Sequence, residues 1–140
     1  MAEPSADELK ALAEMRLADA DAALGCGRAS AAYYLAGYAV ECGLKAIIAL
    51  SFRASVIPDR RFVESVYTHD LNRLVAVAGL AAEVKERARV SDEFRLNWAL
   101  AAAWSEASRY EVIDSFRATS LVQAIGHPTA GVLPWLKAHW

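Results

Sequence analysis

Of the three histidines, His69 has the neighbouring residues best suited to a catalytic or ligand-binding role. It follows Thr68 and precedes Asp70, where a helix is predicted to begin. Apolar residues then recur at helical spacing: Leu71, Leu74, Val75 and Ala78. A histidine here could bind or polarise a phosphate, because the free N–H groups of a helix N-terminus favour anions. The alternative, favoured by the lack of a partner motif, is that Thr68 caps the helix, His69 fixes its start and Asp70 complements its dipole.

Glu41 and Lys45 are a second candidate pair, four residues apart with the acid first, the better order for an ion pair along a helix. They could form a buried polar pair that lines a groove. Alternatively, they pair on a surface between two subunits and fix its orientation, an interaction worth about 0.3–0.5 kcal/mol if exposed. The second reading is favoured, because nothing else in the sequence supplies catalytic geometry around them.

Arg109 and Tyr110 lie in a stretch, residues 105–113, that has neither helical nor strand periodicity and that we expect to be bent or extended. An arginine can grip a phosphate with two N–H groups, and a tyrosine can stack on a base. The alternative is a structural bend in which Arg109 bonds a carbonyl or a carboxylate. The two readings are balanced. This pair is the best single candidate site, because ligand contacts are common in loops.

The two cysteines, Cys26 and Cys42, lack a metal-binding spacing and an evident base, and we expect inert thiols. We expect no metal and no cofactor. A basic segment followed by an apolar one, the mark of a signal peptide, is not seen at the start of the chain. Together with free thiols, this predicts a cytoplasmic protein.

The composition bounds the fold and the partners. The 140 residues suffice for one domain with a real core. The 56% hydrophobic content is high, which predicts that a partner subunit, most simply a second copy, covers some apolar surface. A net charge of −2 does not favour nucleic acid globally, although a local basic patch remains compatible with it.

The other elements are predicted to be organised around a helix over residues 29–51, which is uninterrupted by proline and apolar almost all round, as buried helices are. Glu41 and Lys45 within it argue against a membrane span. Gly37 and Gly43, each costing about 1 kcal/mol of helix propensity, are read as close-packing points for a neighbouring helix.

The remaining chain predicts further helices and no strand. After a flexible segment at residues 1–4, a capping box of Ser5 and Glu8 starts the first helix. Helices or short helices are expected over residues 5–24, 59–67, 68–79, 80–90, 92–105, 114–125 and 131–140. The apolar residues of the segment 59–67 fit one helical face and fit a strand poorly; they are Phe62, Val63, Val66 and Tyr67. The fold class is therefore all-α, a helical bundle in a single domain, 1–140.

Three segments carry a family resemblance. Residues 31–46 resemble the second-helix signature of HEPN domains (higher eukaryotes and prokaryotes nucleotide-binding), roughly A-x-Y-L-x-x-x-A-V-E-x-x-L-K-A. His69, Asp70 and Leu71 with Leu74 resemble the H-D/S-L-x-x-L element. Residues 104–110 resemble a W-x-x-x-x-R-Y segment of one bacterial subgroup. The resemblance covers nearly the whole chain, including its ending at residues 131–136.

The resemblance implies an antiparallel up-and-down bundle of four to five main helices that is usually a homodimer. Many HEPN proteins accompany minimal nucleotidyltransferases in toxin–antitoxin pairs. Others are metal-independent ribonucleases with an R-x4-6-H motif shared across the dimer. That spacing is not present here, because Arg61 precedes His69 by eight positions and Arg117 precedes His127 by ten.

Three functions are consistent with these observations. The first is a homodimeric binding module for nucleotide, RNA or a protein partner such as a nucleotidyltransferase, within a toxin–antitoxin-like system. The second is a divergent ribonuclease in which His69 acts as acid and base while Arg109 stabilises phosphate charge. The third is a purely structural partner protein.

Overall fold

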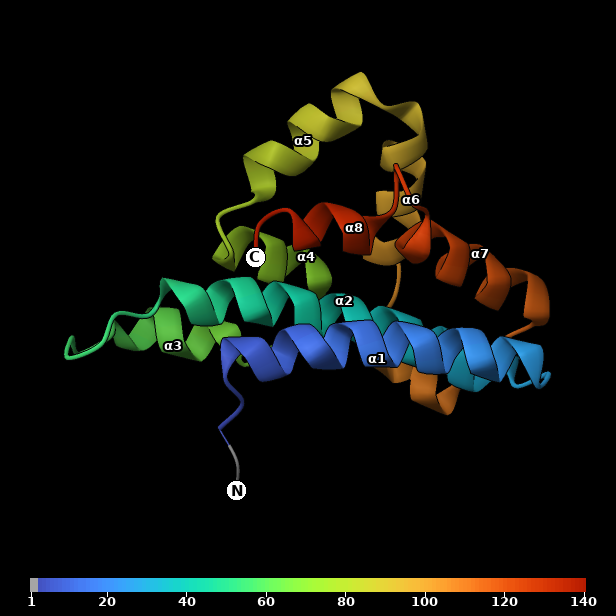
Figure 1. Cartoon of the computed structure of the whole chain (residues 1–140), viewed down its shortest axis with the longest axis horizontal. Helices are drawn as coiled ribbons and strands as arrows, with labels where there is room; N and C mark the ends of the chain where they lie inside the picture. The colour runs from blue at the N-terminus through green and yellow to red at the C-terminus, as the bar shows by residue number, and fades with distance from the viewer. Residues whose placement is uncertain (1–2) are drawn as a thin grey trace.

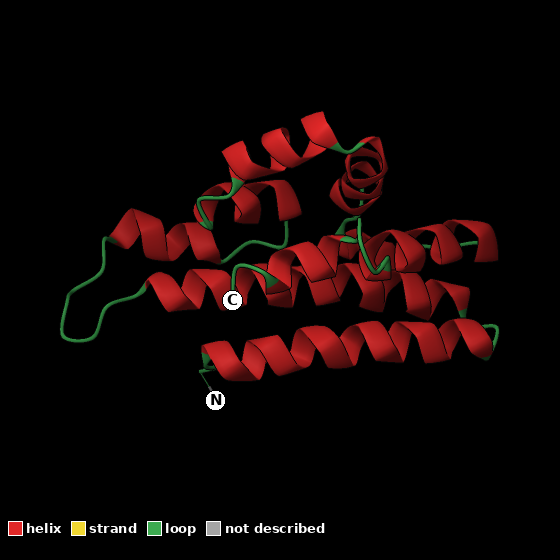
Figure 2. Cartoon of the chain, turned by 45° about the horizontal axis from the view of Figure 1, so that its top comes forward, coloured by secondary structure: helices red, strands yellow, loops and turns green. Residues whose placement is uncertain are grey.

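The computed structural model describes residues 3–140, and within them all the regular secondary structure is helical, with no strand (Figure 2). The predicted all-α class is confirmed. Of the flexible segment expected at residues 1–4, residues 1 and 2 lie outside the described part, and residues 3–5 are not helical. The elements are α1 (Ala6–Gly25), α2 (Ala29–Ser51), α3 (Arg60–Val66), α4 (Leu71–Val77), α5 (Ala81–Val90), α6 (Asp92–Ala102), the 3-10 helix η1 (Glu106–Tyr110), α7 (Ser115–Gly126) and α8 (Val132–Lys137).

The two longest helices, α1 and α2, form an antiparallel hairpin along one side of the molecule (Figure 1). The predicted capping box starts α1: the Ser5 hydroxyl accepts from the Glu8 N–H at 3.2 Å, and the Glu8 carboxylate accepts from the Ser5 N–H at 2.7 Å. Gly27, with φ of 74°, allows the tight turn between the helices, because this left-handed backbone conformation favours glycine.

Helix α2 is the centre of the fold, as its apolar sequence predicts. Twelve of its 23 residues are buried, and α1, α4, α7, α8 and η1 all pack on it. By length and composition α2 is the one helix of residues 3–140 that could cross a membrane, yet more than half of its apolar window is buried inside this fold.

The two glycines of α2 are both close-packing points. At Gly43 an added Cβ would lie 3.2 Å from Leu136 and 3.5 Å from Leu133, so α8 crosses α2 closely there. At Gly37 the neighbour is the indole ring of Trp104, which lies beyond the end of α6. A neighbouring helix was predicted at both positions, and the structure places one at Gly43 only.

A second group of helices lies on the side of α2 away from α1 (Figure 1). Helices α4 and α8 contact α2 directly, and α5 and α6 pack against each other beyond them. Ser91 ends α5 and begins α6, where its hydroxyl accepts from the Phe94 N–H. Asn97, the one polar residue in an inward row of α6, donates from its amide to the Ala130 carbonyl at 3.0 Å. This bond fixes α6 against the turn between α7 and α8.

Three local predictions need correction. Residues 105–113 contain the 3-10 helix η1, capped by Ser105, in place of a wholly bent or extended segment. Helix α6 ends at Ala102, short of the predicted residue 105. The cap of α4 is Asp70, not Thr68: its carboxylate accepts from two backbone N–H groups of the first turn. Tyr67, which follows the last residue of α3, is 83% exposed.

Candidate functional site

Three of the candidate residues meet at one place, together with a fourth that the sequence did not reveal. The His69 ring lies between two carboxylates, with Nδ1 2.8 Å from Glu41 Oε1 and Nε2 3.1 Å from Glu106 Oε2. Lys45 Nζ lies 3.3 Å from the other oxygen of Glu41. We name Glu41, Lys45, His69 and Glu106 the carboxylate clamp. The clamp connects three parts of the chain: helix α2, the 3-10 helix η1, and the loop that precedes α4.

The clamp follows from the burial of Glu41. Only 4% of its side chain is exposed, and a buried carboxylate is stable only when it is paired and hydrogen-bonded. Lys45 and His69 supply one partner to each of its two oxygens. When the imidazole carries two protons, both of its nitrogens donate, so His69 can hold Glu41 and Glu106 at the same time.

A pocket of about 420 Å³ opens beside the clamp. Its lining residues are Thr68, His69, Asp70, Asn72, Ala102, Ala103, Trp104, Ser105 and Glu106. Two of these are acidic, which disfavours a phosphate here by charge repulsion. Glu41 and Glu106 approach opposite nitrogens of the ring, so they cannot ligate one ion with it. Across residues 3–140, no three His, Cys, Asp or Glu side chains are arranged to hold a metal ion.

Asp70 lines this pocket but serves the backbone. One carboxylate oxygen accepts from the N–H groups of Asn72 and Arg73 at 2.9 and 3.2 Å, and the other lies 3.7 Å from the Arg73 guanidinium. Asp70 therefore caps α4, close to the structural role predicted for it. His69 does not cap the helix; its contacts are to side chains of other elements.

Arg109 and Tyr110 are separate from these contacts, on the exposed side of η1. The Arg109 guanidinium lies 4.9 Å from the centre of the Tyr110 ring, and Tyr110 is 81% exposed. The neighbouring Tyr110 side chain raises the pKa of the Arg109 guanidinium, which stays charged. Within residues 3–140, Arg109 forms no ion pair and bonds no carbonyl, so the contact of a structural bend is not observed.

Three residues that follow in the sequence were not predicted to belong to a site. Val112 and Phe116 are exposed, Phe116 by 83%. Arg117 lies 4.8 Å above the Tyr33 ring and 3.4 Å from the Glu111 carboxylate. We name Arg109, Tyr110, Val112, Phe116 and Arg117 the η1–α7 surface. Phe116 could have been found in the sequence, because it lies off the inward stripe of α7.

The cysteines take no part in either arrangement. Burial raises the pKa of the Cys42 thiol to about 11, and the nearby Glu41 charge adds to the effect. Cys42 is therefore protonated at neutral pH, in keeping with the inert thiol expected. Cys26 is exposed at the end of α1.

The contacts of the carboxylate clamp predict how a substitution at His69 changes the free energy of unfolding. Replacing His69 with alanine is expected to lower the free energy of unfolding by about 1–3 kcal/mol, because the buried Glu41 carboxylate loses a hydrogen-bond partner. The same replacement in a Glu41→Gln background should lower it by less than about 1 kcal/mol, because no buried charge remains. Urea denaturation of the four proteins gives the coupling energy. Equal losses in both backgrounds would show that His69 does not support Glu41.

Comparison with protein-family models, with curated proteins and with solved structures finds no match.

Proposed function

We propose that this protein is a homodimeric binding module with a HEPN-type helical bundle, and that it holds single-stranded RNA on its η1–α7 surface without cleaving it. The observation that carries the proposal is the exposed stack of Arg109 on Tyr110. A second exposed ring, Phe116, and a second guanidinium, Arg117, follow within the next seven residues. Aromatic rings with arginines are what sequence-tolerant binding of single strands requires.

The two kinds of side chain supply different parts of the binding energy. Stacking a base on an exposed ring contributes about 1–3 kcal/mol, and it is available to every base. The guanidinium of Arg109 is free to bond a phosphate with two N–H groups. Arg117 shares its charge with Glu111, so its contribution is smaller. We therefore expect modest affinity with a shallow salt dependence, a slope of log K against log salt of about −1.

Cleavage is the less favoured alternative. A general acid or base must present a free nitrogen to the substrate. Both nitrogens of His69 face carboxylates, and Asp70 adds a further negative charge at the same pocket. A phosphodiester is disfavoured there, so the ribonuclease hypothesis with His69 and Arg109 has weak geometric support.

The test is a titration of a fluorescein-labelled single-stranded RNA, followed by fluorescence anisotropy. Tyr110→Ala and Phe116→Ala are each expected to weaken binding about 5- to 150-fold, the equivalent of one lost stacking contact. Tyr67→Ala is the matched control: Tyr67 is 83% exposed but lies at the end of α3, so binding should not change.

Two results would contradict the proposal. One is a wild-type protein that does not bind the RNA at low salt. The other is an equal loss of affinity in Tyr67→Ala and Tyr110→Ala. Gel analysis of the RNA after incubation checks the absence of cleavage, and cleavage abolished by both His69→Ala and Arg109→Ala would establish the ribonuclease alternative.

A protein partner is the second candidate for the same surface. Val112, almost wholly exposed between the two rings in the sequence, has no role in stacking but suits the apolar centre of a protein interface. A minimal nucleotidyltransferase is the partner that the family resemblance suggests. Calorimetry with such a nucleotidyltransferase tests this candidate. Binding of the nucleotidyltransferase to the wild-type protein but not to Val112→Asp, together with no binding of RNA, would favour it.

A further inference from the structure

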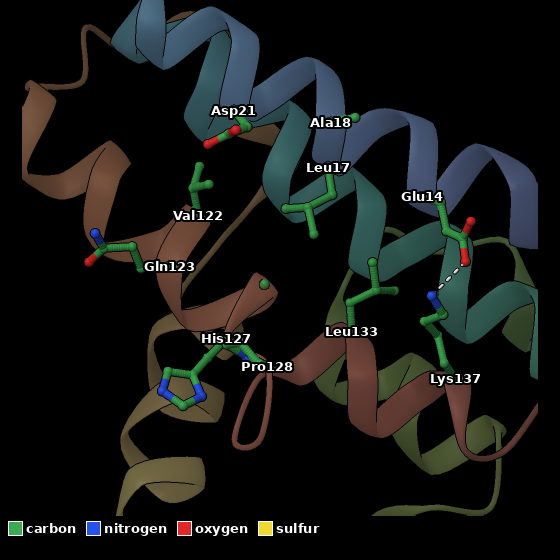
Figure 3. Close-up of a pocket in the computed structure, with 11 residues that line it drawn as sticks. Glu14, Leu17, Ala18, Asp21, Val122, Gln123, His127, Pro128, Leu133 and Lys137 are labelled. Carbon is green, nitrogen blue, oxygen red and sulfur yellow. Dashed lines mark ion pairs between the residues drawn. The ribbon is translucent and has the colours of Figure 1, made fainter.

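A groove of about 680 Å³ lies between α1, α7 and α8, and Figure 3 shows the side chains that line it. Its floor is apolar, formed by Leu17, Val122 and Leu133. Such a floor is suited to receive an apolar side chain from outside.

The rim of the groove is acidic. Lys137, one of its cations, is neutralised by Glu14 at 2.7 Å, the ion pair drawn in Figure 3. His127 is paired with Glu93 at 2.9 Å. Asp21 points toward the groove and forms no ion pair within residues 3–140. An incoming segment should therefore be apolar at its centre and carry a positive charge beside it.

The loop between α2 and α3 has that chemistry. It projects beyond the α1–α2 hairpin at one end of the molecule (Figures 1 and 2). Ile57 is 95% exposed at this tip, with Val56 beside it. Arg53 and Arg61 flank them, and neither forms an ion pair within residues 3–140. We name these four residues the tip.

The backbone conformation of the tip is already restricted in the unbound protein. Ile57 precedes Pro58, which restricts it to extended backbone. Ser55 has φ of 62°, a left-handed conformation that only a few per cent of residues other than glycine adopt. Little conformational entropy would remain to be lost when the tip docks. In Figure 1 the loop between α2 and α3 lies beyond one end of the hairpin. The residues that line the groove belong to α1, α7, α8 and the turn between α7 and α8, so a chain does not fill its own groove.

We propose that the tip of one copy docks in the groove of a second copy, and that the reciprocal contact closes the homodimer. Ile57 and Val56 would cover the apolar floor, while Arg53 and Arg61 would approach the carboxylate of Asp21. A two-fold dimer uses each such contact twice, so two small contacts act together. This inference rests on the homodimer in the proposed function and names its interface.

Sedimentation velocity across micromolar concentrations tests the interface. The wild-type protein should sediment as a dimer. Ile57→Asp should weaken the dimer roughly 100-fold, because the lost apolar contact occurs twice. Leu96→Asp is the matched control, since Leu96 is an exposed aliphatic residue on α6 and the dimer should persist.

A charge exchange tests the pairing of the tip with the groove. Asp21→Arg should weaken the dimer, and adding Arg53→Asp and Arg61→Asp to it should restore the dimer. A wild-type dimer that persists in both Ile57→Asp and Asp21→Arg would overturn the docking and leave the homodimer standing. A monomeric wild-type protein would overturn both. RNA binding is measured separately, and its result tests neither the docking of the tip nor the homodimer.

Discussion

Replacing Gly131 with alanine is expected to lower the free energy of unfolding by about 4 kcal/mol or more. An added Cβ would lie 2.6 Å from the His127 nitrogen and 2.7 Å from the Ile125 carbonyl oxygen, and closer still to the His127 carbonyl oxygen. These are backbone atoms, which cannot move aside as a flexible side chain can. The Gly131 N–H also bonds the His127 carbonyl, so relief would break the turn between α7 and α8.

Chemical denaturation measures this effect, and Gly126→Ala is the control. At Gly126, the last residue of α7, an added Cβ would meet only Leu17 at 3.4 Å, an ordinary contact. We expect a change within about 1 kcal/mol there. Since whole domains are stable by only about 5–15 kcal/mol, Gly131→Ala should be mostly unfolded at modest urea concentrations. If Gly131→Ala unfolded at the same midpoint urea concentration as the wild-type protein, the turn between α7 and α8 would be packed more loosely than described.

The second large effect is expected for Gly37→Ala, a loss of about 3 kcal/mol. The new Cβ would overlap the indole ring of Trp104, which is 4% exposed and rigid. The ring also lies 6.1 Å from Tyr34, so little space remains into which it could shift. Near-ultraviolet circular dichroism and urea denaturation report the displaced indole and the lost stability.

Gly25→Ala is the control for Gly37→Ala, because an added Cβ at Gly25 meets nothing within 4 Å and alanine is the better helix former. Replacing Trp104 with phenylalanine makes room and removes an indole N–H that is buried without a hydrogen-bond partner. The double variant should therefore lose less stability than the sum of the two single changes. A strictly additive double variant would contradict the close contact of Gly37 with Trp104.

The same contact connects the core to the proposed binding surface. Trp104 lies two residues before η1, and Glu106 of η1 is held by His69. The packed indole and the carboxylate clamp therefore fix the start of the 3-10 helix whose far end carries Arg109 and Tyr110. Changes at Gly37 should weaken RNA binding as well as stability, through the position of η1.

Local patterns predicted most of the helices because the interactions that start and stop helices are local. The capping box of Ser5 and Glu8 spans four residues, and the Glu41–Lys45 pair spans one helical turn. The burial of α2 follows from apolar residues on all its sides. Each of these is contained within a few neighbouring positions.

What escaped prediction depends on contacts between distant segments. His69 reaches Glu41 in one direction and Glu106 in the other, and a single sequence contains no sign of either contact. Thr68 and Asp70 are both good caps, so the start of α4 was ambiguous by two residues. The structure places His69 outside the helix, where it contacts Glu41. Arg109 and Tyr110 were found because their stretch lacked periodicity. Phe116 was missed although it lies off the inward stripe of a predicted helix, because a single exposed apolar residue on a helix is ordinary.

Photo-crosslinking to a 4-thiouridine-containing RNA, followed by trypsin digestion and mass spectrometry, tests RNA binding most directly. Trypsin cuts after Arg109 and Arg117, so one peptide, residues 110–117, contains both Tyr110 and Phe116. The proposal predicts that the crosslinked nucleotide is found on this peptide. A crosslink found instead on residues 62–73, the peptide that contains Tyr67 and His69, would contradict it.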